Sequence, residues 1–138
     1  MVALIERSGA VIANEQAKGA NVPRADSLGV LSAGLFASTQ MMAEQLGEEE
    51  SPEIFCHGKQ HNIFVAPVSA EFALLALFPE GVAVGAVRLH ARKAAQTMRN
   101  DLQQVVRNRT SYSPTSIPAA VVGTAMTEAV DGPFLQFS

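Results

Sequence analysis

Seventeen consecutive residues without a charged side chain, from Ser27 to Ala43, constrain the fold of this chain more than any other feature. Asp26 precedes the run and is a residue type that caps helix N-termini, while Gly47 follows it and suits the left-handed backbone that ends a helix. The run therefore predicts a helix with marked ends. It is shorter than the about 20 apolar residues of a membrane span and contains polar side chains such as Gln40, so no span is expected.

Two apolar stripes follow this helix at helical spacing. The first predicts packing on the core of the chain and consists of Leu28, Leu31, Leu35, Met42 and Leu46. The second has small residues at its centre and consists of Val30, Ala33, Gly34, Ala37 and Met41. Small side chains let another backbone approach closely, so the second stripe predicts contact with a further element. That element is either the same helix in a second copy or another part of this chain.

Composition places the chain among globular proteins. Its 138 residues suffice for one domain with an ordinary core, and they include 48% hydrophobic and 17% charged residues, with a net charge of −3. Lysines and arginines are not combined with groove-reading elements, so no nucleic-acid partner is expected. A single cysteine, Cys56, excludes an intrachain disulfide and fits a reducing compartment. The first residues lack the pattern of a signal peptide, so a cytoplasmic location is expected.

Strands are predicted on both sides of the uncharged helix. Val2–Ile5 and Ala10–Ala13 are short apolar runs, and Gly9 between them supplies the positive φ of a hairpin turn. After the helix, an acidic stretch from Glu44 to Glu53 reads as a solvated connector. Three strands are then predicted, at residues 54–57, 62–67 and 72–78. The last is apolar throughout, which is typical of a central strand covered on both faces.

A second, amphipathic helix is predicted from Val84 onward. Its apolar positions at 3/4 spacing are Val84, Val87, Ala91, Ala95, Met98, Leu102 and Val105. Six of the ten basic residues lie between Arg88 and Arg109, on its other face. The predicted domain ends at residue 109, and residues 110–138 read as a Ser/Pro linker followed by an apolar tail.

Signals for catalysis or metal binding are weak. Cys56 and His57 are neighbours on a predicted strand, so their side chains point to opposite faces and cannot pair as nucleophile and base. His57 and His61 flank a turn without a third ligand, and His90 lies on the basic helix face, where solvent exposure is the simplest interpretation. No phosphate-binding or dinucleotide-binding loop is present. We therefore expect neither catalytic residues nor a metal or cofactor.

Four segments carry a resemblance to a known family. They read ALIERSGAVI (3–12), LSAGLFAST (31–39), AEQLGE (43–48) and VGAVRL (84–89), and His57-Gly58 follows the third predicted strand. In order and spacing they resemble the Roadblock (dynein light-chain) family, most closely its bacterial MglB-type members, which regulate Ras-like GTPases. The order hairpin, helix, three strands, helix is α+β.

The resemblance implies a five-stranded antiparallel sheet in the order 2-1-5-4-3 with helices on both faces. It also implies a homodimer formed through the uncharged helix and edge strand three, with the expected interface residues Val30, Ala33, Gly34, Ala37, Met41, Ile54, Phe55 and Cys56. Such dimers are platforms for small Ras-like GTPases, and MglB-type members activate them without a catalytic residue of their own. Arg24, Ser38 and Arg88 are the expected partner-binding residues.

The chain departs from the family pattern at both ends. Family members usually have a helix before strand one, and this sequence begins at the predicted strand one, so we expect that first helix to be missing. Our hypothesis is that residues 119–137 fold back into its place or dock on a partner. Two other functions stay open, namely a dimeric scaffold without a nucleotide-dependent role and a sensor of a small ligand.

Overall fold

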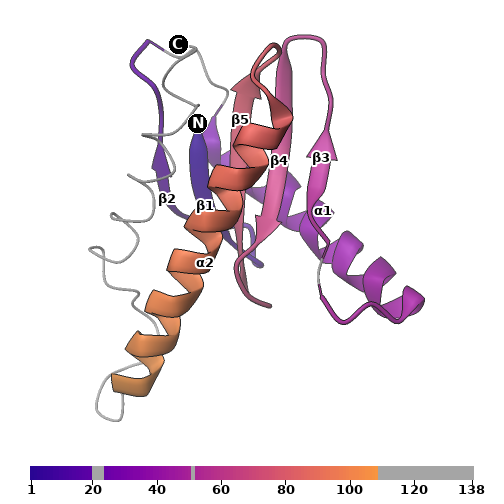
Figure 1. Cartoon of the computed structure of the whole chain (residues 1–138), viewed down its shortest axis with the longest axis vertical. Coiled ribbons are helices and arrows are strands. Elements are labelled where there is room, and N and C mark those ends of the chain that lie inside the picture. Colours follow the sequence, from indigo (N-terminus) through magenta and orange to yellow (C-terminus); the bar gives the residue numbers. More distant parts are fainter. Residues whose placement is uncertain (20–23, 51, 109–138) are drawn as a thin grey trace.

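The computed structural model describes residues 1–19, 24–50 and 52–108 and contains five strands and two helices in these ranges (Figure 1). In chain order they are β1 (Val2–Glu6), β2 (Val11–Glu15), α1 (Ala25–Leu46), β3 (Ile54–Cys56), β4 (His61–Pro67), β5 (Phe72–Pro79) and α2 (Val84–Asn108). Every strand and both helices were predicted, with ends that differ by at most three residues, which reflects the fraying of element ends.

The strands form one antiparallel sheet in the order β2-β1-β5-β4-β3, as the family resemblance implied. β5 lies at the centre, and its residues 73–78 are buried, which confirms the prediction from its apolar sequence. β1 pairs with both neighbours, so that Leu4 lies opposite Ala13 of β2 and Leu74 of β5. β2 and β3 are the two edges.

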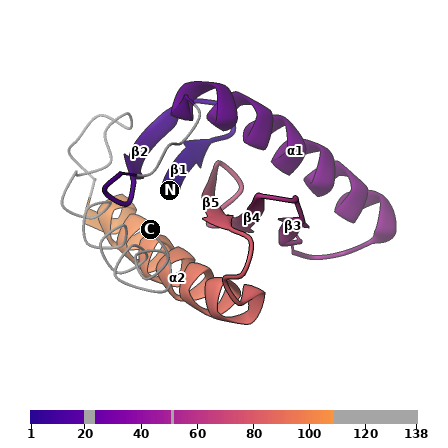
Figure 2. The same ribbon diagram turned by 90° about the horizontal axis from the view of Figure 1, so that it is seen from above.

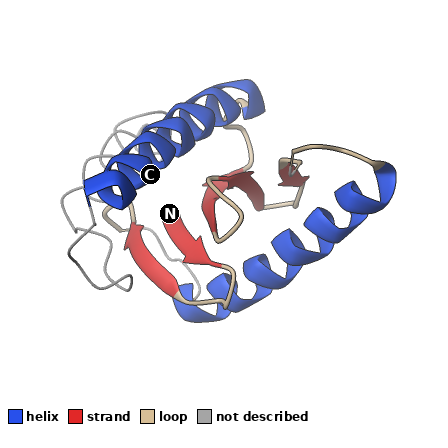
Figure 3. Ribbon diagram, turned by 90° about the horizontal axis from the view of Figure 1, so that it is seen from below, coloured by secondary structure: helices blue, strands red, loops and turns tan. Residues whose placement is uncertain are grey.

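The two helices cover opposite faces of the sheet (Figures 2 and 3). Because side chains alternate along a strand, each face buries its own cluster. On the α2 side the larger buried strand residues are Val2, Leu4, Phe64, Leu74 and Phe78, packed with Val87, Ala91, Ala95 and Met98 of the helix. On the α1 side they are Ile5, Val65, Leu75 and Leu77, packed with Phe36 and with Met1, which precedes β1.

The ends of α1 agree with the prediction only at the C-terminus. Gly47 is left-handed, with φ 73°, and the N–H groups of Gly47 and Glu48 donate to the carbonyls of Glu44 and Ala43. Asp26 is not the N-cap, since Arg24 occupies that position without a side-chain cap. Asp26 lies instead in the first turn, where its carboxylate interacts favourably with the positive end of the helix dipole.

Two glycines bring the β1–β2 turn against α1. Gly9 has φ 97°, as its predicted role in the hairpin requires, and a Cβ there would lie 3.2 Å from Cα of Val30. A Cβ on Gly29 would lie 2.5 Å from Cγ2 of Val11 and 3.0 Å from the carbonyl oxygen of Gly9. The hairpin therefore determines which face of α1 turns toward the sheet.

Neither helix of the described residues is long and apolar enough to cross a membrane. The predicted domain end at residue 109, the Ser/Pro linker and the apolar tail lie outside the described residues.

Candidate functional site

The outward face of α1 is apolar and open to solvent. We call it the outer α1 face, and it consists of Val30, Leu31, Gly34, Leu35, Ser38, Met41, Met42 and Leu46. Its large side chains are exposed by 38% at Leu35 and by 61–76% at the other five positions. Single exposed apolar residues are ordinary, but a continuous face of this kind is typical of a protein interaction site.

The predicted division of α1 into two stripes was partly wrong. Of the stripe expected to face the core, only Leu28 packs against it, whereas Leu31, Leu35, Met42 and Leu46 are exposed. The buried face is made by Gly29, Ser32, Ala33, Phe36 and Ala43. The close contact of Gly29 with the hairpin explains this, because a helix face of small residues allows α1 to approach the sheet.

Ala33 and Ala37 are therefore placed differently from the other interface candidates on α1. Ala33 is only 4% exposed and faces its own sheet, so it does not belong to the outer α1 face, and Ala37 is half-buried at its border. Val30, Gly34 and Met41 are exposed, and a Cβ on Gly34 would meet no atom within 4 Å.

Edge strand β3 is a second open feature of the domain. It pairs only with β4, in the register Phe55 opposite Phe64, so its other backbone edge has no strand beside it among the described residues. Phe55 is 41% exposed, and its ring centroid lies 6.4 Å from that of Phe78. Cys56 is exposed and Ile54 is half-buried. Unpaired strand edges are templates for pairing with another chain.

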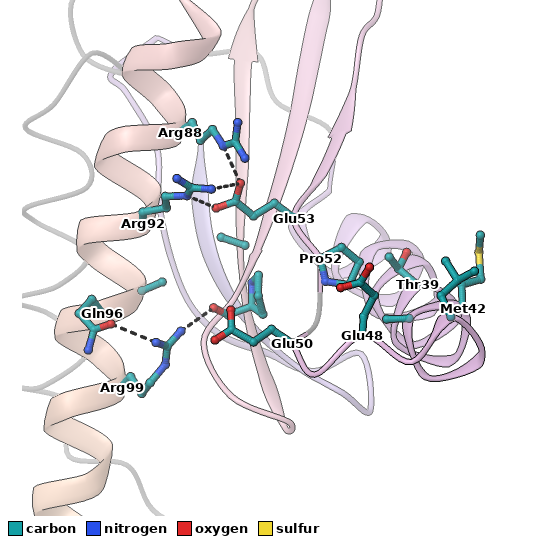
Figure 4. A pocket seen from close by; sticks show the side chains of 15 residues that line it. Thr39, Met42, Glu48, Glu50, Pro52, Glu53, Arg88, Arg92, Gln96 and Arg99 are labelled. Atoms are coloured by element: carbon teal, nitrogen blue, oxygen red, sulfur yellow. Dashed lines mark hydrogen bonds and ion pairs between the residues drawn. The ribbon is translucent and has the colours of Figure 1, made fainter.

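Glu53 joins the start of β3 to α2 through two arginines (Figure 4). Arg88 Nε donates to Glu53 Oε2 at 2.6 Å, and the Arg92 guanidinium donates to both carboxylate oxygens. Burial raises the pKa of Glu53, but hydrogen bonds and charge attraction from Arg92 and Arg88 outweigh burial and hold that pKa below its ordinary value. The pKa of Arg92 is raised by the same pair.

This ion pair corrects the interpretation of residues 44–53 as a solvated connector. Glu48, Glu49 and Glu50 are exposed, but the Glu53 side chain is only 17% exposed and holds β3 against the helix.

Arg99 attaches α2 to the far end of β4. Its Nε donates to the carbonyl oxygen of Val68 at 2.8 Å, its Nη2 to that of Pro67 at 3.3 Å, and its Nη1 to Gln96 Oε1 at 3.0 Å. Backbone carbonyls and a side-chain amide therefore occupy all three nitrogens of this guanidinium, which orients it toward the end of β4.

A groove of about 800 Å³ lies between α1, the acidic connector and α2 (Figure 4). α1 contributes Thr39, Met42, Ala43 and Leu46, the connector contributes Glu48, Glu50, Pro52 and Glu53, and α2 contributes Arg88, Arg92, Ala95, Gln96 and Arg99. Ala66 and Pro67 of β4 close the remaining wall. The three arginines face three glutamates, so the lining carries no net formal charge.

The remaining candidate residues lie on the surface and are not brought together. Arg24 is exposed at the N-cap of α1, and the Ser38 hydroxyl donates to the Gly34 carbonyl at 2.9 Å in the same helix. Arg88 is held by Glu53. His57 and His61 are exposed. Within the described ranges, no three His, Cys, Asp or Glu side chains cluster in a way that could hold a metal ion.

Residues 1–78, more than half of the chain, match the model of the Roadblock/LC7 domain. This chain belongs to the Roadblock/LC7 family. Among solved structures, an MglB with a tetrameric arrangement and the gliding protein MglB from Thermus thermophilus are each 32% identical to this Roadblock domain, with a TM-score of 0.66. In both matches 72% of this chain and 74% of the other chain are covered.

Myxococcus xanthus MglB is 26% identical, with a TM-score of 0.64, over 75% of this chain and 82% of that one. No curated protein matches this sequence.

Two features of this Roadblock domain escaped prediction. Glu53 was not singled out, although its place two positions before Phe55 puts both side chains on the α2 side of the sheet. Asn62 is 2% exposed, and its Oδ1 accepts the Gly58 N–H at 3.1 Å. A Cβ on Gly58 would lie 2.3 Å from the His61 carbonyl oxygen, so His57-Gly58 marks a turn that only glycine fits.

Proposed function

We propose that this Roadblock domain is a cytoplasmic homodimer that regulates, or serves as an adaptor for, a small Ras-like GTPase. The single observation that carries the proposal is that one chain of the Roadblock/LC7 family has both an exposed apolar outer α1 face and an open β3 edge. The likeness to MglB structures supports the choice of a GTPase as the partner.

We propose dimerisation because each of these two features can pair with its own counterpart in a second copy of the chain. Two β3 edges related by a twofold axis pair antiparallel and supply hydrogen-bond partners for their exposed backbone groups. The same axis brings two α1 helices together. Gly34 has open space above its Cα, and such a position lets two helix backbones approach closely.

We further propose that the domain contributes no catalytic side chain to GTP hydrolysis. Arg88 is held by Glu53 through its Nε, and Arg99 is bonded to backbone carbonyls, so neither side chain is poised as a mobile arginine finger. Arg24 is the exposed arginine at the end of α1 and is the residue to test for a direct role. Activation would otherwise proceed by orienting the GTPase's own residues toward the γ-phosphate.

The test is a pull-down from the source organism's lysate, run once with a non-hydrolysable GTP analogue and once with GDP. The expected result is recovery of a small GTPase mainly in the GTP state, followed by faster GTP hydrolysis when the two purified proteins are mixed. The Arg24→Ala variant should still accelerate GTP hydrolysis. The Leu31→Glu variant, altered on the outer α1 face, should bind less of the GTPase. Equal recovery of the same proteins in both states, without a GTPase, would overturn the proposal in favour of a dimeric scaffold.

A further inference from the structure

A second groove, of about 430 Å³, lies between the C-terminal half of α2 and the turn that joins β4 to β5. We call it the Phe72–Leu102 groove, and its lining residues are Ser69, Glu71, Phe72, Arg99, Leu102, Gln103 and Arg107. It shares only Arg99 with the groove between the two helices.

Phe72 and Leu102 supply the apolar wall of the Phe72–Leu102 groove. Phe72 and Leu102 are half-buried and pack against the core cluster on the α2 side of the sheet, so their remaining surface forms the groove wall. The charged lining residues are Arg99, Arg107 and Glu71, which together carry a net formal charge of +1. An apolar wall combined with a weakly positive charge in the lining suits an apolar segment that carries acidic residues.

The chain itself supplies such a segment where it leaves the groove. Arg107 lines the groove and is the penultimate residue of α2, and thirty residues follow Asn108. Residues 119–137 are mostly small or apolar and include Phe134, Leu135 and Phe137, and their charged side chains are Glu128 and Asp131. The ten residues 109–118 reach up to about 33 Å when extended, enough to turn the chain back.

We infer that the Phe72–Leu102 groove is the docking site of residues 119–137 of the same chain. Docking buries the aromatic residues of the segment on Phe72 and Leu102 and places its two carboxylates near Arg99 and Arg107. This contact is independent of the proposed GTPase partner, because it needs only the chain itself.

The first test uses the fact that the chain contains no tryptophan. In the full-length Phe134→Trp variant, docking predicts a blue-shifted indole emission and acrylamide quenching several-fold weaker than that of a free indole. Adding Leu102→Gln should move both values toward those of a solvated indole, with circular dichroism to verify that the helices persist. If the indole of the single variant Phe134→Trp has the emission and the quenching of a solvated indole, the inference is overturned.

The second test does not depend on altering the groove wall. In a full-length Cys56→Ser background, Gln103→Cys on the groove is combined with Leu135→Cys in the segment and mildly oxidised. The matched control replaces Gln103→Cys by Gly85→Cys, which is exposed on α2 about 27 Å away along the same helix.

Docking predicts an intramolecular disulfide that forms at least tenfold faster at position 103 than at position 85. Equal rates at both positions show a segment that does not dock and overturn the inference. A product of dimer mass places the segment on a second copy and overturns it as well.

Discussion

Gly29 of α1 and Val11 of β2 touch so closely that a Cβ on the glycine would lie 2.5 Å from the valine Cγ2 methyl. This contact turns the face of α1 that carries Ala33 and Phe36 toward the sheet. It thereby directs Val30, Leu31, Met41 and Met42 to solvent and creates the surface on which the proposed dimer depends.

Gly29→Ala is expected to destabilise the domain by up to about 2 kcal/mol, because overpacking costs about 1–3 kcal/mol and exceeds the gain in helix propensity of about 1 kcal/mol. Urea unfolding followed by circular dichroism measures this. Gly34→Ala is the matched control in the same helix, since its Cβ meets open space and should leave stability unchanged or raised. Equal effects of the two substitutions would contradict the proposed role of Gly29.

Gly34→Leu is expected to weaken self-association without unfolding the monomer. A side chain at this position points away from the domain, so the added leucine clashes only with a second helix packed there. Such overpacking costs about 1–3 kcal/mol, which corresponds to roughly a 5- to 150-fold rise in the dimer Kd. Sedimentation equilibrium of the wild type and of Gly34→Leu measures the two dimer Kd values. An unchanged Kd would rule out close packing at this position.

Cys56 provides a separate probe of the β3 edge. It is exposed in the single chain, and pairing of two β3 strands would shield it. Its rate of alkylation by a maleimide should therefore fall as protein concentration rises through the dimer Kd, and Gly34→Leu should restore the fast rate at each concentration. A rate independent of concentration in a protein that does dimerise would show that β3 lies outside the interface.

Glu53→Gln is expected to lower stability at neutral pH by breaking the link between β3 and α2. Since the folded pKa of Glu53 lies below its ordinary value of 4.5, the carboxylate stabilises the fold above that value and this contribution is lost as pH falls through the lower folded pKa.

Thermal unfolding at pH 7 and at decreasing pH should therefore show a difference between wild type and Glu53→Gln that shrinks in acid. High salt should also reduce it, because the arginines are half exposed. Glu49→Gln, an exposed residue of the same connector, is the control. A difference that persists undiminished in acid would exclude the ion pair as its cause.

Asn62→Ala is expected to cost about 1–3 kcal/mol, because it removes the acceptor of the Gly58 N–H within a half-buried turn. Chemical denaturation measures the loss, and His61→Ala, an exposed neighbour on the same strand, should change stability by much less. Similar losses for both would show that the turn does not depend on this hydrogen bond.

Much of the fold was predictable from local patterns. Gly9 and Gly47 have the positive φ that their positions required, and the unbroken apolar sequence of β5 identified the central strand. These predictions succeeded because turn chemistry, helix termination and burial on two faces depend on a few neighbouring residues. The sheet order came from the family resemblance and is confirmed.

The sequence by itself determined that α1 has more apolar surface than one packing face uses. Only the tertiary structure decided which part is buried, because Leu31 and Ala33 are both compatible with a core and the approach of the hairpin to Gly29 selects Ala33. Tertiary structure likewise decided the role of Glu53, whose arginine partners are 35 and 39 positions away. Local pattern cannot encode such contacts, since they depend on how separate elements are placed in space.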